Sequence, residues 1–126
     1  MGDVAGAVVL GVGQACAWPA PGFLLVGLAI GAVVGLMPGV GGPAMLAILI
    51  PFTIPLSPPN AFALLMGAVS VLATTGDVSS ILLGIPGEAV SAAMVVDGHA
   101  MARQGEAGRA LGAALMSSMV GAVVGA

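Results

Sequence analysis

The sequence predicts an all-α, polytopic membrane-protein fragment with discontinuous (Pro-Gly broken) or re-entrant helices. First, no charged side chain occurs from Val4 to Gly76. Second, 60% of the 126 residues are hydrophobic and only 6% are charged, whereas soluble domains carry roughly 25% charged residues. Third, proline-glycine breaks at residues 38–43 and 86–87 interrupt the apolar runs. Because hydrocarbon cannot satisfy freed backbone N–H and C=O groups, such breaks lie within protein or line a polar cavity.

Charge and cysteine content narrow the function classes. The chain has two arginines, no lysine and a net charge of −3, so it offers no basic patch for nucleic acid. Its single cysteine, Cys16, excludes an intrachain disulfide and a cysteine-cluster metal site.

The first elements are a short helix over residues 1–15, expected to be interfacial, and a strongly apolar helix from Pro21 or Gly22 to Met37. Trp18 lies between them, where aromatic side chains often mark a membrane interface. The apolar helix carries Gly27, Gly31 and Gly35. Spaced four residues apart, they form one stripe that lets another helix approach closely. Gly35, next to the break, could also admit a ligand.

After the first break, residues 44–56 form an apolar run that contains Pro51 and Pro55. At about 1.5 Å per residue this run is too short for a full crossing. It predicts a half-helix or a re-entrant arm that turns at residues 57–60. Asn60 is the expected cap of a following helix over residues 61–73.

The remaining segments are shorter. Residues 74–80 form a polar cluster, residues 81–85 are apolar, and residues 88–96 predict another short segment. Residues 97–99 predict a turn, and residues 100–110 predict a loop or interfacial helix that is cytoplasmic by the positive-inside tendency. The sequence stops inside an apolar run, so residues 1–126 are expected to be the N-terminal part of one transmembrane transporter domain.

The breaks suggest a binding site for an anion. A helix that begins within the membrane presents unpaired N–H groups and the positive end of its dipole, and both favour an anionic ligand. One helix would begin near Pro43, and a second half-helix would begin at Gly87. Two such ends converging would form a carboxylate site without a cationic side chain. The alternative is a kinked helix whose freed groups are satisfied by neighbours. The candidate substrate-binding residues are Pro38, Gly39, Val40, Gly41, Gly42, Pro86, Gly87 and Glu88.

Asp77 suggests a site for a coupling ion. An ionisable side chain within a membrane segment is by default a functional hypothesis. Oxygen atoms of Asp77 and its neighbours could bind Na⁺, or the carboxylate could take up a proton. Alternatively, Asp77 lies at the aqueous end of its helix and caps the next one, and Glu88 likewise suits a capping position. The candidate coupling-ion residues are Thr74, Thr75, Asp77, Ser79 and Ser80.

An enzyme is not expected. Residues 74–77 only partly match the Gly-x-Gly-Asp motif of intramembrane aspartyl proteases, because position 74 is threonine. Such chemistry also needs a second membrane aspartate, and Asp97 falls in the predicted turn. His99 has no acid or thiol at ligand spacing. We therefore expect no catalytic residue, no resident metal and no cofactor other than a possible Na⁺ or H⁺ as coupling ion.

Two motifs resemble a known family. Residues 85–88 read Ile-Pro-Gly-Glu, residues 97–112 read Asp-Gly-His-Ala-Met-Ala-Arg-Gln-Gly-Glu-Ala-Gly-Arg-Ala-Leu-Gly, and residues 35–42 read Gly-Leu-Met-Pro-Gly-Val-Gly-Gly. They resemble, in order and spacing, the large membrane subunit of tripartite tricarboxylate transporters, the TctA family, from about Phe23 onward. There are departures from the family pattern: His99-Ala100 replaces a common Tyr-Pro, and Thr75-Gly76-Asp77 stands where many members have Gly-Gly-Ser.

The resemblance implies a multi-pass permease subunit of a secondary carboxylate transporter in the bacterial inner membrane. It implies an ion gradient as driving force and, as partners, a small membrane subunit and a periplasmic solute-binding protein. The departure at residues 75–77 leaves the size of the carboxylate open. The alternative function is a noncatalytic membrane scaffold, in which the glycine stripe and the breaks serve only packing and assembly.

Overall fold

The structure is a computed structural model that describes residues 2–125. Over those residues the chain forms six helices and no strand, which confirms the all-α prediction. The helices are α1 (Gly2–Cys16), α2 (Ala20–Leu36), α3 (Gly42–Thr53), α4 (Pro58–Leu83), α5 (Ala92–Arg103) and α6 (Ala107–Gly125).

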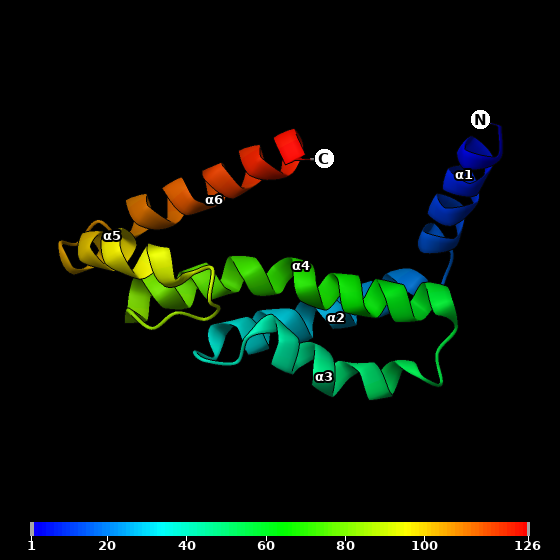
Figure 1. Cartoon of the computed structure of the whole chain (residues 1–126), viewed down its shortest axis with the longest axis horizontal. Coiled ribbons are helices and arrows are strands. Elements are labelled where there is room, and N and C mark those ends of the chain that lie inside the picture. The colour runs from blue at the N-terminus through cyan, green and yellow to red at the C-terminus, as the bar shows by residue number, and fades with distance from the viewer. Residues whose placement is uncertain (1, 126) are drawn as a thin grey trace.

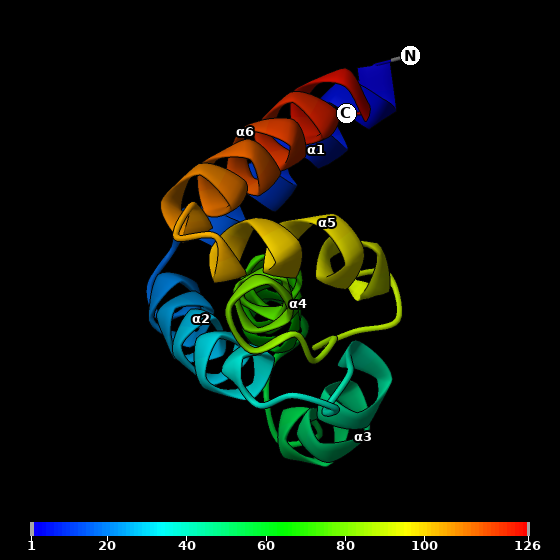
Figure 2. The same ribbon diagram turned by 90° about the vertical axis from the view of Figure 1, so that its left-hand side faces the viewer.

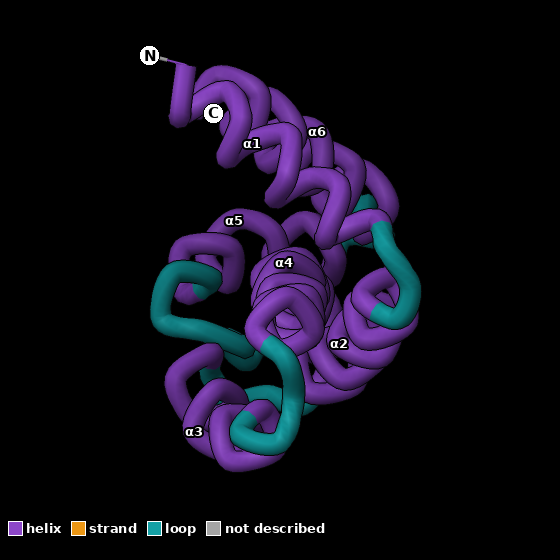
Figure 3. Tube along the Cα trace, turned by 90° about the vertical axis from the view of Figure 1, so that its right-hand side faces the viewer, coloured by secondary structure: helices purple, strands orange, loops and turns teal. Residues whose placement is uncertain are grey.

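Helix α4 lies at the centre, with α2, α3 and α5 arranged around it (Figures 2 and 3). Helices α2 and α4 run in the same direction and touch along their length (Figure 1). The glycine stripe makes this contact possible. A Cβ added to Gly27 or Gly31 would meet the backbone of Ala68 at 3.0 Å or less, and one added to Gly35 would meet Thr75. The predicted role of the stripe in close helix packing is therefore confirmed.

Helix α3 runs back alongside the α2–α4 pair. Its Met45 and Leu49 pack with Ala68 and Leu72 of α4 in one buried apolar cluster. Because α2 and α4 are parallel, the segment between them must return from one end of the pair to the other. The predicted short apolar helix is present, with Pro51 inside it.

A second apolar cluster joins the C-terminal part of α4 to the last two helices. Ile81 of α4 is fully buried against Ala110 and Ala114 of α6, with Met94 and Met101 of α5 packed around them. This cluster fixes the end of α4 and so positions the residues that follow it.

The first helix lies apart from this packing. Helices α1 and α2 bend by 71° at the short connection that holds the exposed Trp18. Within residues 2–125, α4 and α6 are long and apolar enough to cross a membrane, and α1 with α2 makes a third span if counted as one broken helix.

Two predictions about α4 are wrong. Helix α4 does not stop at residue 73 but continues through the polar cluster to Leu83. The reason is that the hydroxyls of Thr75, Ser79 and Ser80 bond to carbonyls of their own helix, so the cluster does not interrupt it. Asn60 is not a cap, because α4 begins at Pro58, a residue suited to the first helical turn.

The region after the second break also differs from the prediction. The helix expected from Gly87 begins at Ala92 instead, and residues 97–99 lie inside α5 rather than in a turn. Gly98 packs directly on Ile81, and the His99 ring bonds to the Ile81 carbonyl, so contact with α4 keeps this stretch helical. Residues 104–106 form the turn, and α6 starts at Ala107, within the predicted polar loop.

Candidate functional site

The first break is an open turn between α2 and α3. Helix α2 ends at Leu36, Gly39 adopts a positive φ of 87°, and α3 begins at Gly42 with Pro43 in its first turn. Gly39 supplies the left-handed conformation that other residues rarely adopt. The amides of Ala44 and Met45 both donate to the Gly41 carbonyl, so those two donors are already used.

The second break lies between α4 and α5, at residues 84–91. Gly84 caps α4 in the left-handed conformation, with φ of 69°. Gly87 is buried and its amide donates to the Ser80 hydroxyl at 3.3 Å. An added Cβ on Gly87 would lie 2.7 Å from the Gly76 Cα. The chain therefore returns along α4 with two glycines in direct contact.

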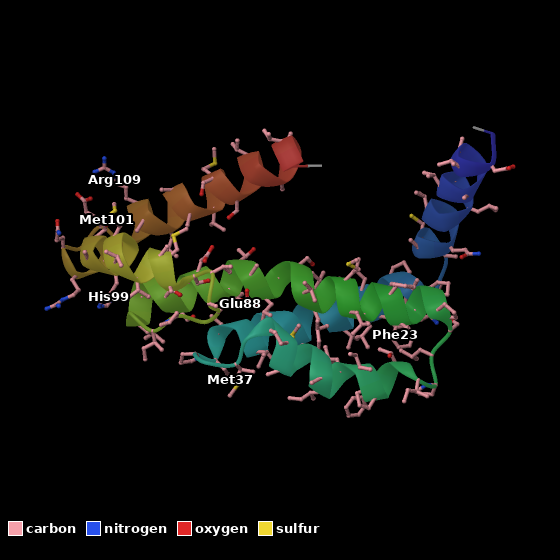
Figure 4. The ribbon with its side chains drawn as sticks, in the orientation of Figure 1. Phe23, Met37, Glu88, His99, Met101 and Arg109 are labelled. Carbon is pink, nitrogen blue, oxygen red and sulfur yellow. The ribbon has the colours of Figure 1, made fainter. Side chains whose placement is uncertain are left out.

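The two breaks meet at a hydrogen bond. The Gly42 amide, the first of α3, donates to the Glu88 carboxylate Oε1 at 3.0 Å. Figure 4 labels Glu88 where residues 84–91 pass the start of α3. Glu88 thus places a negative charge at the positive end of the α3 dipole, a stabilising arrangement. Glu88 was expected to suit a capping position on a helix starting at Gly87, but it caps α3 instead.

Asp77 lies inside the C-terminal part of α4 rather than at a helix end. Its Oδ1 accepts a hydrogen bond of 2.9 Å from the Ser91 hydroxyl, and Ser91 is 1% exposed. Its partner Ser91 is the residue directly before α5, so Asp77 lies at the start of the next helix, although it does not end its own helix as the capping alternative expected. Asp77 itself is half-buried.

Three of the other four predicted coupling-ion residues, Thr75, Ser79 and Ser80, have hydrogen-bond partners within the protein. The hydroxyls of Ser79 and Ser80 donate to the Gly76 carbonyl at 2.9 and 2.8 Å. The Thr75 hydroxyl lies 2.9 Å from the Val71 carbonyl and 3.4 Å from the Gly31 carbonyl of α2. Thr74 is half-buried, and its side chain bonds to no group within residues 2–125. The structure therefore places Asp77, Ser79 and Ser80 beside the second break and Thr75 at the α2 contact.

Several backbone donors around the meeting point remain free. Within residues 2–125, the amides of Gly39, Gly41, Glu88 and Ala89 donate to no acceptor. Pro38, Gly39 and Pro86 are exposed, and Val40 and Gly41 are half-buried. These amides are the groups with which an approaching carboxylate could form hydrogen bonds.

Two cavities of the structure lie elsewhere. One, of about 470 Å³, lies between α1, α2 and α4, and another, of about 310 Å³, lies between α2, α3 and α4. Gln14 is the only polar side chain among their lining residues, and neither cavity touches either break. Within residues 2–125, no group of three or more histidine, cysteine or acidic side chains could hold a metal ion.

The chain matches known proteins over the part that holds this site. The profile of the tripartite tricarboxylate transporter TctA family matches residues 22–126, a range that contains both breaks. The chain belongs to this family. An uncharacterized 52.8 kDa protein from the TAR-I ttuC' 3' region of Agrobacterium vitis is 40% identical to this TctA-family chain over 93 residues. The aligned part is 74% of this chain and 18% of that relative, so the chain spans under a fifth of the relative's length. No solved structure matches the chain.

Ser91 is the functional candidate that sequence reasoning missed. It lies between apolar residues, 14 positions from Asp77, and no local pattern signals that the two side chains meet. Glu88 was recognised as a candidate, but its partner Gly42 is 46 positions away. Glu88 and Gly42 meet because the start of α3 lies beside the segment that follows α4, and only the tertiary structure shows this.

Proposed function

We propose that this chain is part of the membrane-embedded permease subunit of a binding-protein-dependent secondary transporter for tricarboxylates or related carboxylates. An ion gradient drives the transport, and the solute crosses unaltered. The observation that carries the proposal is the meeting of the two breaks at the Gly42–Glu88 bond. Each break lies within the part of the chain that the TctA profile matches.

The substrate site of this proposal lies at the joined breaks. It comprises Pro38, Gly39, Val40, Gly41, Gly42, Pro86, Gly87 and Glu88. The free amides of Gly39 and Gly41 bind a substrate carboxylate, and the glycines allow it to approach the backbone. Discontinuous helices form substrate and ion sites in other secondary transporters by the same physical means.

The coupling ion, Na⁺ or H⁺, binds at Asp77. Thr74, Thr75, Ser79 and Ser80 are the other proposed members of this ion site. The half-buried carboxylate supplies the charge, and hydroxyl oxygens are suitable additional ligands for a hard cation.

The proposed setting is the bacterial inner membrane, with the chain as part of a multi-pass subunit in the lipid bilayer. Its partners are a small membrane subunit and a periplasmic solute-binding protein of the same transporter. The apolar helices α4 and α6 support the membrane location. The family description, which names a tripartite transporter, supports the partners.

Uptake by the complete three-component system tests the proposal. Cells or vesicles that carry the intact system are given labelled citrate and a panel of labelled dicarboxylates, with and without a Na⁺ or H⁺ gradient. Gly41→Leu and Asp77→Asn are expected to abolish gradient-driven uptake at normal protein levels. Glu106→Gln, at an exposed position outside the site, is the matched control and should transport normally.

A scaffold without a substrate site is the second candidate. Two observations favour a scaffold: the glycine stripe serves helix packing, and the Glu88 carboxylate already accepts the hydrogen bond of the Gly42 amide. It predicts that well-expressed Gly41→Leu and Asp77→Asn variants take up substrate as the unmodified system does. That result would overturn the proposed substrate and ion sites.

A further inference from the structure

The eight residues 84–91, here called the strap, are held to two different helices by polar contacts. The strap leaves α4 at Gly84 and reaches α5 at Ser91. Gly87 holds the middle of the strap against α4. Its amide donates to the Ser80 hydroxyl, and its backbone packs closely against Gly76. The strap is thus held in place by specific contacts with α3 and α4.

Two acidic side chains link the strap to its neighbouring helices by hydrogen bonds. Asp77 of α4 accepts the bond from the Ser91 hydroxyl at 2.9 Å, and Glu88 of the strap accepts the bond from the Gly42 amide of α3 at 3.0 Å. Within the strap, the Ser91 amide donates to the Glu88 carbonyl at 3.1 Å. Three hydrogen bonds, joined through the covalent structure of Ser91 and Glu88, therefore link Asp77 to the start of α3.

We propose that the strap is the coupling element that transmits the state of Asp77 to the start of α3, with Ser91 and Glu88 as its positioning residues. The inference rests on the proposed function, in which Asp77 binds the coupling ion. An ion or proton on Asp77 competes with the Ser91 hydroxyl for the carboxylate. Release of Ser91 loosens the strap, and Glu88 carries this change to Gly42 and the first break.

The proposal is based on the burial of Ser91, on the strength of the two carboxylate bonds and on the lack of another hydrogen-bonded connection between Asp77 and Gly42. Ser91 is 1% exposed, so a hydroxyl that loses Asp77 finds no water in its place without local movement. Bonds to charged groups are stronger than neutral ones, so both carboxylate bonds contribute to holding the strap. Nothing but the strap connects Asp77 to Gly42 by hydrogen bonds within residues 2–125.

Hydrogen–deuterium exchange of the intact subunit in lipid nanodiscs tests the inference. Ser91→Ala removes a side chain that does not touch α3. Exchange is expected to rise about tenfold in the strap, the effect of losing one bond to a charged group, and to rise also at residues 38–46. Ser91→Thr, which keeps the hydroxyl, should restore protection in both segments. Glu106→Gln is the control and should change neither.

A second variant covers the case in which Ser91→Ala disturbs the fold. Asp77→Asn keeps the size of the side chain and an oxygen that can accept the Ser91 bond, but it removes the charge and so weakens that bond. Exchange should rise in the same two segments, by less than in Ser91→Ala, while residues 64–72 stay protected. Glu88→Ala should expose residues 38–46, and Glu88→Gln, whose amide oxygen can still accept the Gly42 bond, should protect them better.

The inference is overturned if Ser91→Ala and Asp77→Asn raise exchange only in the strap and leave residues 38–46 unchanged. This outcome is separate from failure of the proposed function. Exchange needs no transport, so a system that transports carboxylate without this linkage refutes the strap alone, and a system without uptake refutes the function.

Discussion

At the scale of single residues, glycines of α2 allow the backbone of α4 to approach closely. A Cβ on Gly31 would lie within 3.0 Å of the Ala68 Cα, and backbone atoms cannot move aside as a flexible side chain can. The α2–α4 contact therefore depends on the absence of a side chain at this position. By contrast, a Cβ on Gly112 of α6 would meet nothing within 4 Å.

We predict that Gly31→Ala destabilises the intact subunit by about 1–3 kcal/mol, because the two helices must separate to accept the methyl group. Gly112→Ala is the control and should be neutral or stabilising by up to about 1 kcal/mol, since alanine favours a helix over glycine. Thermal unfolding of the detergent-solubilised subunit measures both. Equal effects of the two substitutions would mean that α2 and α4 do not pack in this way.

Ser79 and Ser80 form a natural pair for comparison. Both are buried and both donate to the Gly76 carbonyl, but only Ser80 also accepts a bond from the Gly87 amide. We predict that Ser80→Ala costs about 1–2 kcal/mol more than Ser79→Ala, because it leaves a buried N–H without a partner. The same unfolding assay measures the difference. A larger loss for Ser79→Ala would contradict the path of the strap along α4.

At the scale of elements, the sequence shows where helices break but not where every helix ends. Pro-Gly pairs and four-residue glycine spacing are local signals, and both breaks and the glycine stripe are predictable from them. The end of α4 is not, because the hydroxyls of residues 75, 79 and 80 satisfy their own helix and the polar cluster stays helical. Hydroxyl side chains are ambiguous in this respect, since they also favour turns.

The start and course of α5 depend on contacts with α4. The Asp97-Gly98-His99 sequence suggests a turn, yet Gly98 packs against Ile81 and the His99 Nδ1 lies 3.1 Å from the Ile81 carbonyl. Because a carbonyl only accepts, Nδ1 carries the hydrogen in this bond. Tertiary contact here overrides the local turn preference, and no single-sequence pattern signals it.

We predict that His99→Ala loosens the α4–α5 contact. It removes a hydrogen bond worth about 1 kcal/mol at the end of α4, where carbonyl groups lack partners within the helix. Hydrogen exchange at residues 80–84 and 97–103 should rise several-fold. Asp97→Ala, two positions away and exposed, should leave both segments as they are. If the two variants behave alike, the His99 bond does not hold α5 in place.

At the scale of the whole molecule, the parallel arrangement of α2 and α4 predicts a membrane topology. The turn that leads into α4 and the turn between α5 and α6 lie at opposite ends of the structure (Figure 1). Arg103 and Arg109 flank the α5–α6 turn, and His99 and Arg109 are labelled at that end in Figure 4. From the positive-inside tendency we predict that this end faces the cytoplasm.

Cysteine labelling tests this topology, in a background where Cys16→Ser removes the thiol of residues 1–126 and any further cysteines of the intact subunit are also replaced. Asn60→Cys and Gln104→Cys should react with a membrane-impermeant maleimide from opposite sides, with Gln104→Cys accessible from the cytoplasm. Labelling of both from one side would contradict the path of α4 through the membrane.

The candidate site also depends on the tertiary structure, because its residues come from both breaks. Sequence reasoning named Glu88 and Asp77 from their position in an apolar region, and it named the glycines from the break motif. It could not pair Glu88 with Gly42 or Asp77 with Ser91, because those contacts join residues 46 and 14 positions apart.

The most direct measurement is an experimental structure of the intact transporter with a bound carboxylate, determined by electron cryomicroscopy in nanodiscs. The account predicts that α2 and α3 are separated at residues 37–41, and that the carboxylate lies within hydrogen-bonding distance of the Gly39 or Gly41 amide, beside Glu88. A carboxylate bound away from both breaks, or unbroken helices through residues 38–43 and 84–91, would contradict it.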